Sequence, residues 1–154
     1  MASRSEIFSR LERALLDAGI VTVYRGIFIP SEAALPETSY PVAAYYEDSI
    51  ENIDDYEYGS RCHQEASLDI WMNVGELGPY DETRKVALAQ LDDLHDAVVR
   101  KINVMFINYA SQTLVYKLTS FQPYWFMGNE PAIGGGFKLK TSYTIAPAAS
   151  DIPA

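Results

Sequence analysis

The stretch Ser60–Asn103, SRCHQEASLDIWMNVGELGPYDETRKVALAQLDDLHDAVVRKIN, decides the fold because its hydrophobic period changes once along its length. From Arg61 to Met72 apolar and polar residues alternate, which is typical of a strand with one face in the core. Trp71 is the exception, since it falls on the polar side. Two glycines and a proline then interrupt the chain. The apolar spacing that follows lengthens to three or four and predicts an amphipathic helix from about Asp81 to about Asn103, with its apolar stripe at Ala87, Leu91, Leu94, Val98, Ile102 and Met105.

One further helix and four further strands are predicted outside this stretch. The apolar residues of Arg4–Ala18 fall on one helical face, and Gly19 is suited to end that helix. Runs of β-branched, aromatic or alternating residues predict strands at Ile20–Ile29, Tyr40–Tyr46, Leu114–Phe121 and Phe137–Ile145. The expected fold is therefore α+β, with one antiparallel or mixed sheet, two helices packed on one face, and the element order α-β-β-β-α-β-β.

The segments between these elements are expected to be loops of one domain. Glu47–Gly59 contains six acidic residues and no Lys or Arg, and we expect a flexible connection there. We expect Gln122–Gly136 to be a long loop, in which Gly134–Gly136 forms a flexible turn rather than a phosphate-binding loop, because no Lys-Ser/Thr and no helix follow. Residues 1–146 are predicted to form the domain, and 147–154 a flexible tail.

Composition argues against several classes of function. The net charge of −9 opposes the wrapping of nucleic acid, which requires Lys and Arg to neutralise phosphates. No apolar run approaches the length that spans a bilayer, so no membrane contact is expected. The first residues lack the apolar segment of a secretory signal, and the single Cys62 cannot form an intramolecular disulfide, which predicts a reducing compartment.

The residue types that carry catalysis or bind metals do not gather in any familiar motif. His95 lies in the long predicted helix near Asp92 and Asp96, and a solvated acidic face explains this group better than a metal site. Cys62 and His63 are adjacent in a strand and therefore point to opposite faces. We expect no enzyme, no cofactor and no metal.

The feature left without an explanation is the consecutive apolar run Tyr124, Trp125, Phe126 and Met127. Consecutive side chains cannot all face one core, so some are expected to project outward, and clustered exposed aromatics are enriched at protein interfaces. These four residues are the predicted contact with another subunit or a neighbouring protein. A loop folded back over its own sheet is the alternative.

In the order of its elements the chain resembles the tail-terminator, or tail-completion, proteins of long-tailed bacteriophages. The resemblance covers nearly the whole chain. It rests on the short helix ending at Asp17-Ala18-Gly19, on Leu35-Pro36 followed by Tyr40-Pro41, on the strand Ser67–Trp71 with its apolar-Asp-apolar-Trp pattern, on the long helix after it, and on the final Tyr143-Thr144-Ile145.

The resemblance implies a structural protein of the virion tail, assembled in the host cytoplasm. Its members form a hexameric ring that caps the head-proximal end of the tail tube, stops tube elongation and joins the tail to the neck or connector. The expected partners are other copies of the chain, the tube protein and the neck or connector protein, with the tail sheath as a further candidate. DNA would pass through without specific binding, and the exposed acids Asp92, Asp93 and Asp96 are candidates for an acidic channel wall. Two alternatives stay open: a neck or head-completion adaptor, and a small cellular ligand-binding or catalytic α+β domain.

Overall fold

Five strands form one mixed sheet with the spatial order β1-β2-β3-β5-β4. The computed structural model describes residues 4–33, 35–56, 59–73, 82–109, 115–124 and 132–145. The short β1 pairs parallel with β2, and every other pairing is antiparallel. The predicted α+β class with one mixed sheet is confirmed. The strands are β1 (Thr22–Arg25), β2 (Val42–Tyr56), β3 (Gly59–Asn73), β4 (Val115–Tyr124) and β5 (Ala132–Ile145).

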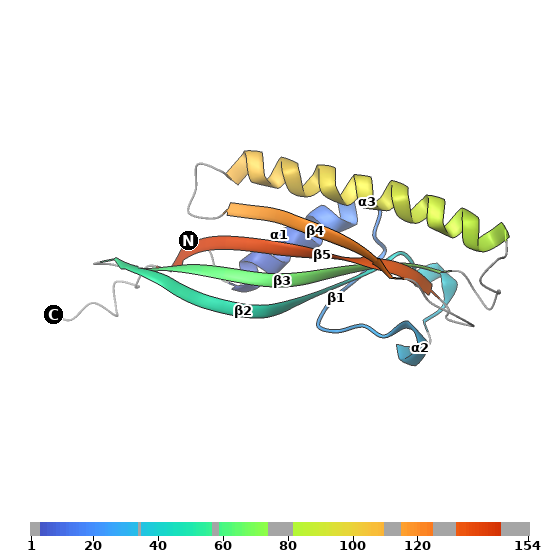
Figure 1. Ribbon diagram of the computed structural model, residues 1–154, viewed down its shortest axis with the longest axis horizontal. Coiled ribbons are helices and arrows are strands. Elements are labelled where there is room, and N and C mark those ends of the chain that lie inside the picture. The colour runs from blue at the N-terminus through green and yellow to red at the C-terminus, as the bar shows by residue number, and fades with distance from the viewer. Residues whose placement is uncertain are drawn as a thin grey trace.

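The two long helices, α1 (Arg4–Asp17) and α3 (Glu82–Tyr109), lie on the same side of the sheet, as predicted (Figure 1). The short helix α2 (Pro30–Ala33) lies on the other side, in the connection between β1 and β2, which also contains a 3-10 turn at Glu37–Ser39. Helix α1 ends where predicted, because Gly19 adopts a φ of 107° that residues with a Cβ rarely take.

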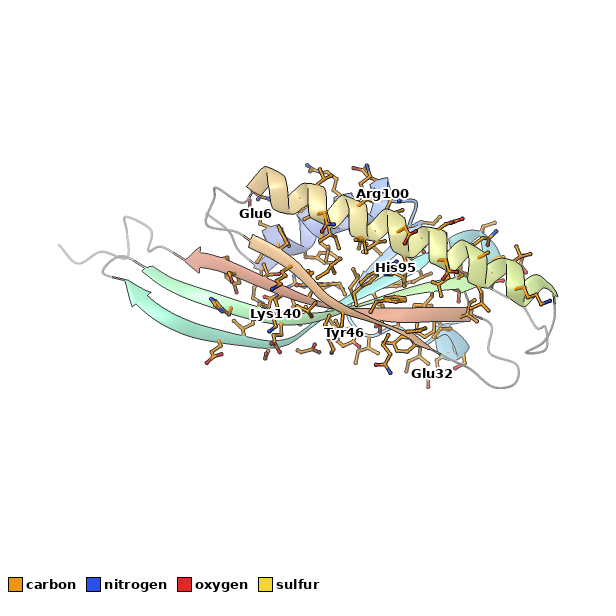
Figure 2. All side chains as sticks on the ribbon, turned by 45° about the horizontal axis from the view of Figure 1, so that its top comes forward. Glu6, Glu32, Tyr46, His95, Arg100 and Lys140 are labelled. Carbon is orange, nitrogen blue, oxygen red and sulfur yellow. The ribbon has the colours of Figure 1, made fainter. Side chains whose placement is uncertain are left out.

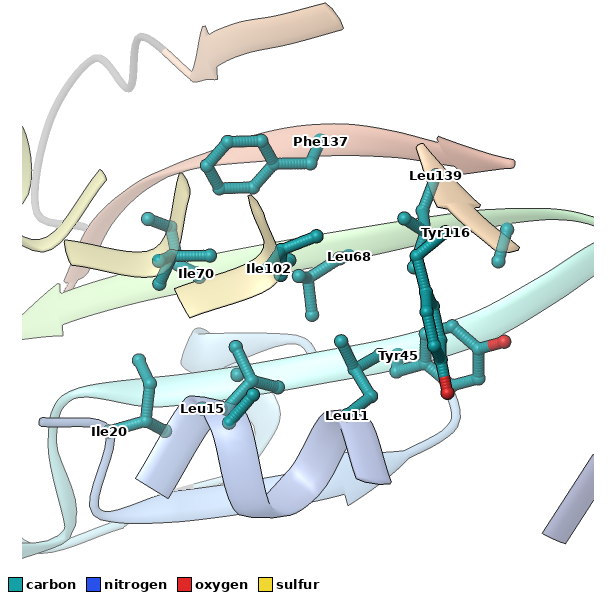
Figure 3. Close-up of a cluster of buried hydrophobic side chains, with 14 of the residues drawn as sticks. Leu11, Leu15, Ile20, Tyr45, Leu68, Ile70, Ile102, Tyr116, Phe137 and Leu139 are labelled. Atoms are coloured by element: carbon teal, nitrogen blue, oxygen red, sulfur yellow. The ribbon is translucent and has the colours of Figure 1, made fainter. Parts of the chain in front are cut away.

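The main core fills the space between the two long helices and the sheet. Figure 3 shows Leu11 and Leu15 of α1 beside Tyr45 of β2, with Ile102 of α3 over the middle of the sheet. The predicted stripe of α3 is buried along its whole length, from Ala87 to Met105. The alternation predicted for β3 and β5 is also present, and the polar Gln64 and Thr141 are buried among the apolar residues of this side. These apolar residues include Cys62, Ala66, Leu68, Ile70, Phe137, Leu139 and Tyr143.

A second, smaller apolar cluster lies on the opposite side of the sheet and explains why Trp71 interrupts the polar face of β3. Trp71 is 5% exposed and packs edge-on against Phe28, at 6.3 Å between ring centroids. The connection between β1 and β2 supplies the cover for this end of the sheet. The cluster consists of Phe28, Tyr40, Val42, Ala44, Trp71 and Ala132, with Leu35 and Tyr124 packed against it.

The prediction of a flexible connection at Glu47–Gly59 is wrong. Strand β2 continues to Tyr56, and it pairs with β3 down to the pair Tyr56 and Gly59, with two bulges on the way. The backbone ladder carries this half of the strand, which projects past both long helices (Figure 1). Because no helix packs on this half of β2, its sequence has no apolar alternation and resembles that of a loop.

The prediction of a long loop at Gln122–Gly136, with a turn at its three glycines, is wrong at both ends. Gln122–Tyr124 completes β4, and Gly134–Gly136 belongs to β5, opposite Trp71, Ile70 and Asp69 of β3. The glycines are required because large neighbouring side chains occupy the space where their own would lie. A Cβ on Gly134, for example, would lie 2.6 Å from Cε3 of Trp71.

Two smaller differences concern the ends of elements. The strand predicted at Ile20–Ile29 is limited to Thr22–Arg25, and Gly26 at its end has a φ of 139°. Helix α3 continues to Tyr109, beyond the predicted end at Asn103. The predicted tail 147–154 lies outside the described residues.

Candidate functional site

The most distinctive surface of the molecule is the polar side of the sheet, opposite α1 and α3. The loop containing α2 covers only the end of this side around Trp71, and polar side chains occupy the rest. Figure 2 shows Tyr46 and Lys140 on the sheet, away from the α3 residues His95 and Arg100. We call this surface the open face and define it by Tyr46, Asp48, Glu51, His63, Glu65, Ser67, Asp69, Lys117, Ser120, Gln122, Lys138, Lys140 and Ser142.

Asp69 forms the centre of a hydrogen-bonded group at one end of the open face. It is only 6% exposed, and its carboxylate accepts two tyrosine hydroxyls. Tyr124 Oη donates to Oδ1 at 2.8 Å, and Tyr46 Oη donates to Oδ2 at 3.3 Å. Gly136 lies directly beneath, and its lack of a side chain leaves room for the Tyr124 hydroxyl and the Asp69 carboxylate. The group therefore connects β3 to its neighbour β2 and, across β5, to the edge strand β4.

Burial and hydrogen bonding act in opposite directions on Asp69. Burial disfavours the charged form and raises its pKa, while the hydroxyls of Tyr124 and Tyr46 stabilise the carboxylate and reduce that rise. The pKa of Tyr124 is also raised, first by burial and then by its bond to Asp69, so its hydroxyl keeps its proton and stays a donor. A tyrosine held protonated in this way serves as a structural donor.

The middle of the open face is held by ion pairs between strands, one of which reaches across β3. Lys138 Nζ lies 3.2 Å from Oδ2 of Asp48 and donates to Oγ of Ser67 at 2.7 Å. Ser67 donates in turn to Asp48 at 2.9 Å. Beside this group Lys140 lies 3.5 Å from Glu65. Most charge on the open face is therefore neutralised locally.

Besides a depression of about 220 Å³ over Thr119, Lys138 and Lys140, two depressions mark the open face. The larger, about 490 Å³, is bordered by Glu51, His63, Glu65, Lys117 and Lys140. The smaller, about 260 Å³, lies against Asp69, Tyr46 and Tyr124. The lining of each includes charged and hydroxyl side chains, and the smaller one contains Ser67 hydrogen-bonded to Lys138.

The predicted aromatic contact residues fall into two groups. Tyr124 is the last residue of β4, half-buried, with its ring 5.4 Å from that of Trp71 and its hydroxyl on Asp69. The prediction that Tyr124 lies in a loop is therefore wrong. Trp125, Phe126 and Met127 lie outside the described residues, and their role stays a prediction.

The predicted acidic residues Asp92, Asp93 and Asp96 are all exposed on α3, on the side away from the sheet. Their neighbour His95 turns toward the sheet, where its ring packs against Phe121 and Phe137 at centroid distances of 4.6 and 5.2 Å. Its Nδ1 lies 3.0 Å from Oδ1 of Asp96. The histidine is a packing residue with one carboxylate contact.

Cys62 and His63 point to opposite faces, as the strand spacing predicts: Cys62 is buried under the helices and His63 lies on the open face. Within the described ranges, no three His, Cys, Asp or Glu residues are grouped so that they could hold a metal ion. Among the helices that the structure describes, none combines the length and apolar character needed to cross a bilayer.

No family model matches the chain, and a search of curated proteins finds no match.

The group around Asp69 was missed by reasoning from sequence, although a signal for it existed. Asp69 and Trp71 alternate onto the same nominally polar face, and a run of three glycines occurs in a later strand. A large aromatic residue on a polar face requires cover, and glycines in a strand often mark a close approach of neighbouring groups. Together these features indicate that β5 lies beside β3, with its glycines under the large side chains.

Proposed function

We propose that this chain is a tail terminator of a long-tailed bacteriophage, a structural subunit that assembles into a ring on the head-proximal end of the tail tube. The single observation that supports it best is the arrangement of the sheet: both long helices cover one face, most of the other face is polar, and its two outer strands lie on opposite edges. A ring requires two different surfaces on each subunit, related by a rotation that closes. A sheet with two unlike edges offers such a pair.

The residues of the open face fit a structural role better than a catalytic one. The charges near its middle are paired with one another, and Asp69 is held by two tyrosine hydroxyls. Such a surface keeps its shape against a neighbouring protein.

The acidity of the chain is consistent with a ring through which DNA passes. Each copy carries a net charge of −9, and Asp92, Asp93 and Asp96 are exposed on one helix. Negative charge repels the phosphate backbone, which favours sliding over binding. The assignment of these three residues to the channel wall belongs to this proposal.

Light scattering on the purified chain over a concentration series tests the proposal first. The expected mass of the assembled species is about six times the 17.2 kDa of one copy. If the chain stays monomeric, its binding to isolated tail tubes decides, because a ring can close on a template. A chain that binds neither itself nor a tube end contradicts the proposal, and binding to a neck complex alone favours the adaptor alternative.

A further inference from the structure

The outer half of β2 is an unpaired strand edge. Strand β1 pairs only with Val42–Tyr45, so within the described part of the chain no strand lies beside Tyr46–Tyr56 on that side. Asp48, Ser49, Ile50 and Glu51 are all exposed. Because successive residues of a strand face opposite sides, exposure of all four means that neither side of this edge is covered.

Strand β4 forms the other edge of the sheet and is similarly open. Lys117, Thr119, Ser120 and Gln122 are exposed, and β4 pairs with β5 on one side only. Pro123 follows with no backbone N–H, which is tolerated at an edge and limits pairing to the residues before it.

The two edges carry opposite charge. Asp48 and Glu51 lie along β2, whose sequence continues with Asp54 and Asp55. On the other side Lys117 lies on β4, opposite Lys140 of β5, which is itself paired with Glu65. Among the side chains that the structure describes, neither Glu51 nor Lys117 forms an ion pair, so both are available to a partner.

The register of the sheet brings the opposite charges to one level. Ser49 pairs with Glu65, Glu65 with Lys140, and Lys140 with Lys117, so these residues form one row across the sheet. When a second copy is placed level with the first, its Lys117 stands beside Ser49 and diagonal to Glu51, within reach of a long side chain. The successive antiparallel pairings make β2 and β4 run in opposite directions, so the new pairing is antiparallel as well.

We infer that copies of this chain associate head to tail, with the β2 edge around Ser49–Glu51 of one copy pairing with the β4 edge around Lys117 of the next. The inference rests on the proposed ring and specifies its subunit contact. The acidic side chains and the bulge between Glu47 and Ser49 oppose pairing of β2 with a second β2, because like charges would face each other. The β4 edge, with a bulge at nearly the same level between Leu118 and Ser120, is the complementary edge. Ile50, 40% exposed at the same edge, gains apolar cover in this arrangement.

A charge exchange between the two edges tests the inference on the full chain. Lys117→Glu and Glu51→Lys each place like charges across the contact, and each should weaken self-association about tenfold. Both side chains are exposed, so neither change should disturb the fold. The double variant restores the opposite pairing with the signs exchanged and should return association to within about threefold of the unmodified chain. Lys101→Glu on the exposed surface of α3 is the matched control and should have no effect.

Analytical ultracentrifugation at low and at physiological salt provides the measurement, since this contact should weaken as salt screens the charges. The inference is overturned if the single variants associate as strongly as the unmodified chain. It is also overturned if the double variant associates no more strongly than the single variant that associates less. An unmodified chain that stays monomeric throughout also overturns it. Each of these results is separable from failure of the terminator proposal, because binding of the unmodified chain to isolated tail tubes is measured independently.

Discussion

Removal of the Tyr124 hydroxyl gives a sharp test of the structure, because that hydroxyl donates to a buried acid at 2.8 Å. In Tyr124→Phe the ring can still pack on Trp71, and Asp69 keeps only the longer bond from Tyr46 at 3.3 Å. A hydrogen bond to a charged group contributes about 1.5–3 kcal/mol, and one between neutral groups about 0.5–1.5 kcal/mol. The loss in the free energy of unfolding should therefore depend on the ionisation of Asp69.

The sign of the pH dependence follows from the direction of the pKa shift. Burial raises the pKa of Asp69 in the folded chain above its unfolded value of about 3.9, so the folded state binds more protons between the two values. The contribution of Asp69 to stability is fully present below the unfolded pKa and is lost as the pH rises through the folded pKa. Tyr124→Phe removes a donor that favours the carboxylate and raises the folded pKa further. The cost of the substitution should thus rise from about 0.5–1.5 kcal/mol at low pH to about 1.5–3 kcal/mol above the folded pKa.

Urea unfolding of both proteins from pH 4 to pH 8 measures this difference, because contributions from all other groups cancel between them. The raised pKa of Tyr124 keeps its hydroxyl a donor over this range. The control is the same substitution in an Asp69→Asn background, where the cost should be about 0.5–1.5 kcal/mol at every pH. A cost independent of pH in the unmodified background, or one below about 0.5 kcal/mol throughout, would refute the reasoning.

Three further results are expected. Trp71→Ala removes the centre of the second apolar cluster and should lower the free energy of unfolding by about 3–5 kcal/mol in urea titrations; a loss below about 1 kcal/mol would contradict its burial. Gly136→Ala places a Cβ 2.7 Å from Asp69 Oδ1 and should cost about 1–3 kcal/mol, less in a Tyr124→Phe background where the hydroxyl is gone; equal costs in both backgrounds would contradict the close approach. Replacement of the three exposed acids of α3 by asparagine should change unfolding by less than about 0.5 kcal/mol, yet increase retention of the assembled chain on immobilised DNA at low salt. Unchanged retention would contradict the assignment of Asp92, Asp93 and Asp96 to the proposed channel wall.

Sequence patterns were sufficient for the fold class and element order because the strongly periodic segments are those that bury a face. The apolar stripe of α3 and the apolar face of β3 both pack into the main core, and the structure confirms both. The outer half of β2 was predicted as a loop because its stability comes from backbone pairing with β3, which leaves no hydrophobic period in the sequence. Propensity for a strand depends on neighbours that a single segment does not reveal.

The candidate site was less predictable than the fold, since it depends on contacts between distant strands. Asp69 and Tyr124 are 55 residues apart, and their hydrogen bond requires that β3, β5 and β4 be adjacent in that order. The glycines of β5 were interpreted as a turn because glycine more often provides conformational freedom than space for a neighbour. Here at Gly136 it provides space for a tyrosine hydroxyl and a carboxylate.

The central claim, that this chain terminates a phage tail, is tested most directly on tail tubes assembled without their terminator. The purified chain is added during tube growth, and tube length and end structure are followed by electron microscopy. The account predicts a ring of this chain on one end of each tube and arrest of elongation at that end. Tubes that continue to lengthen with no chain bound at either end would contradict it.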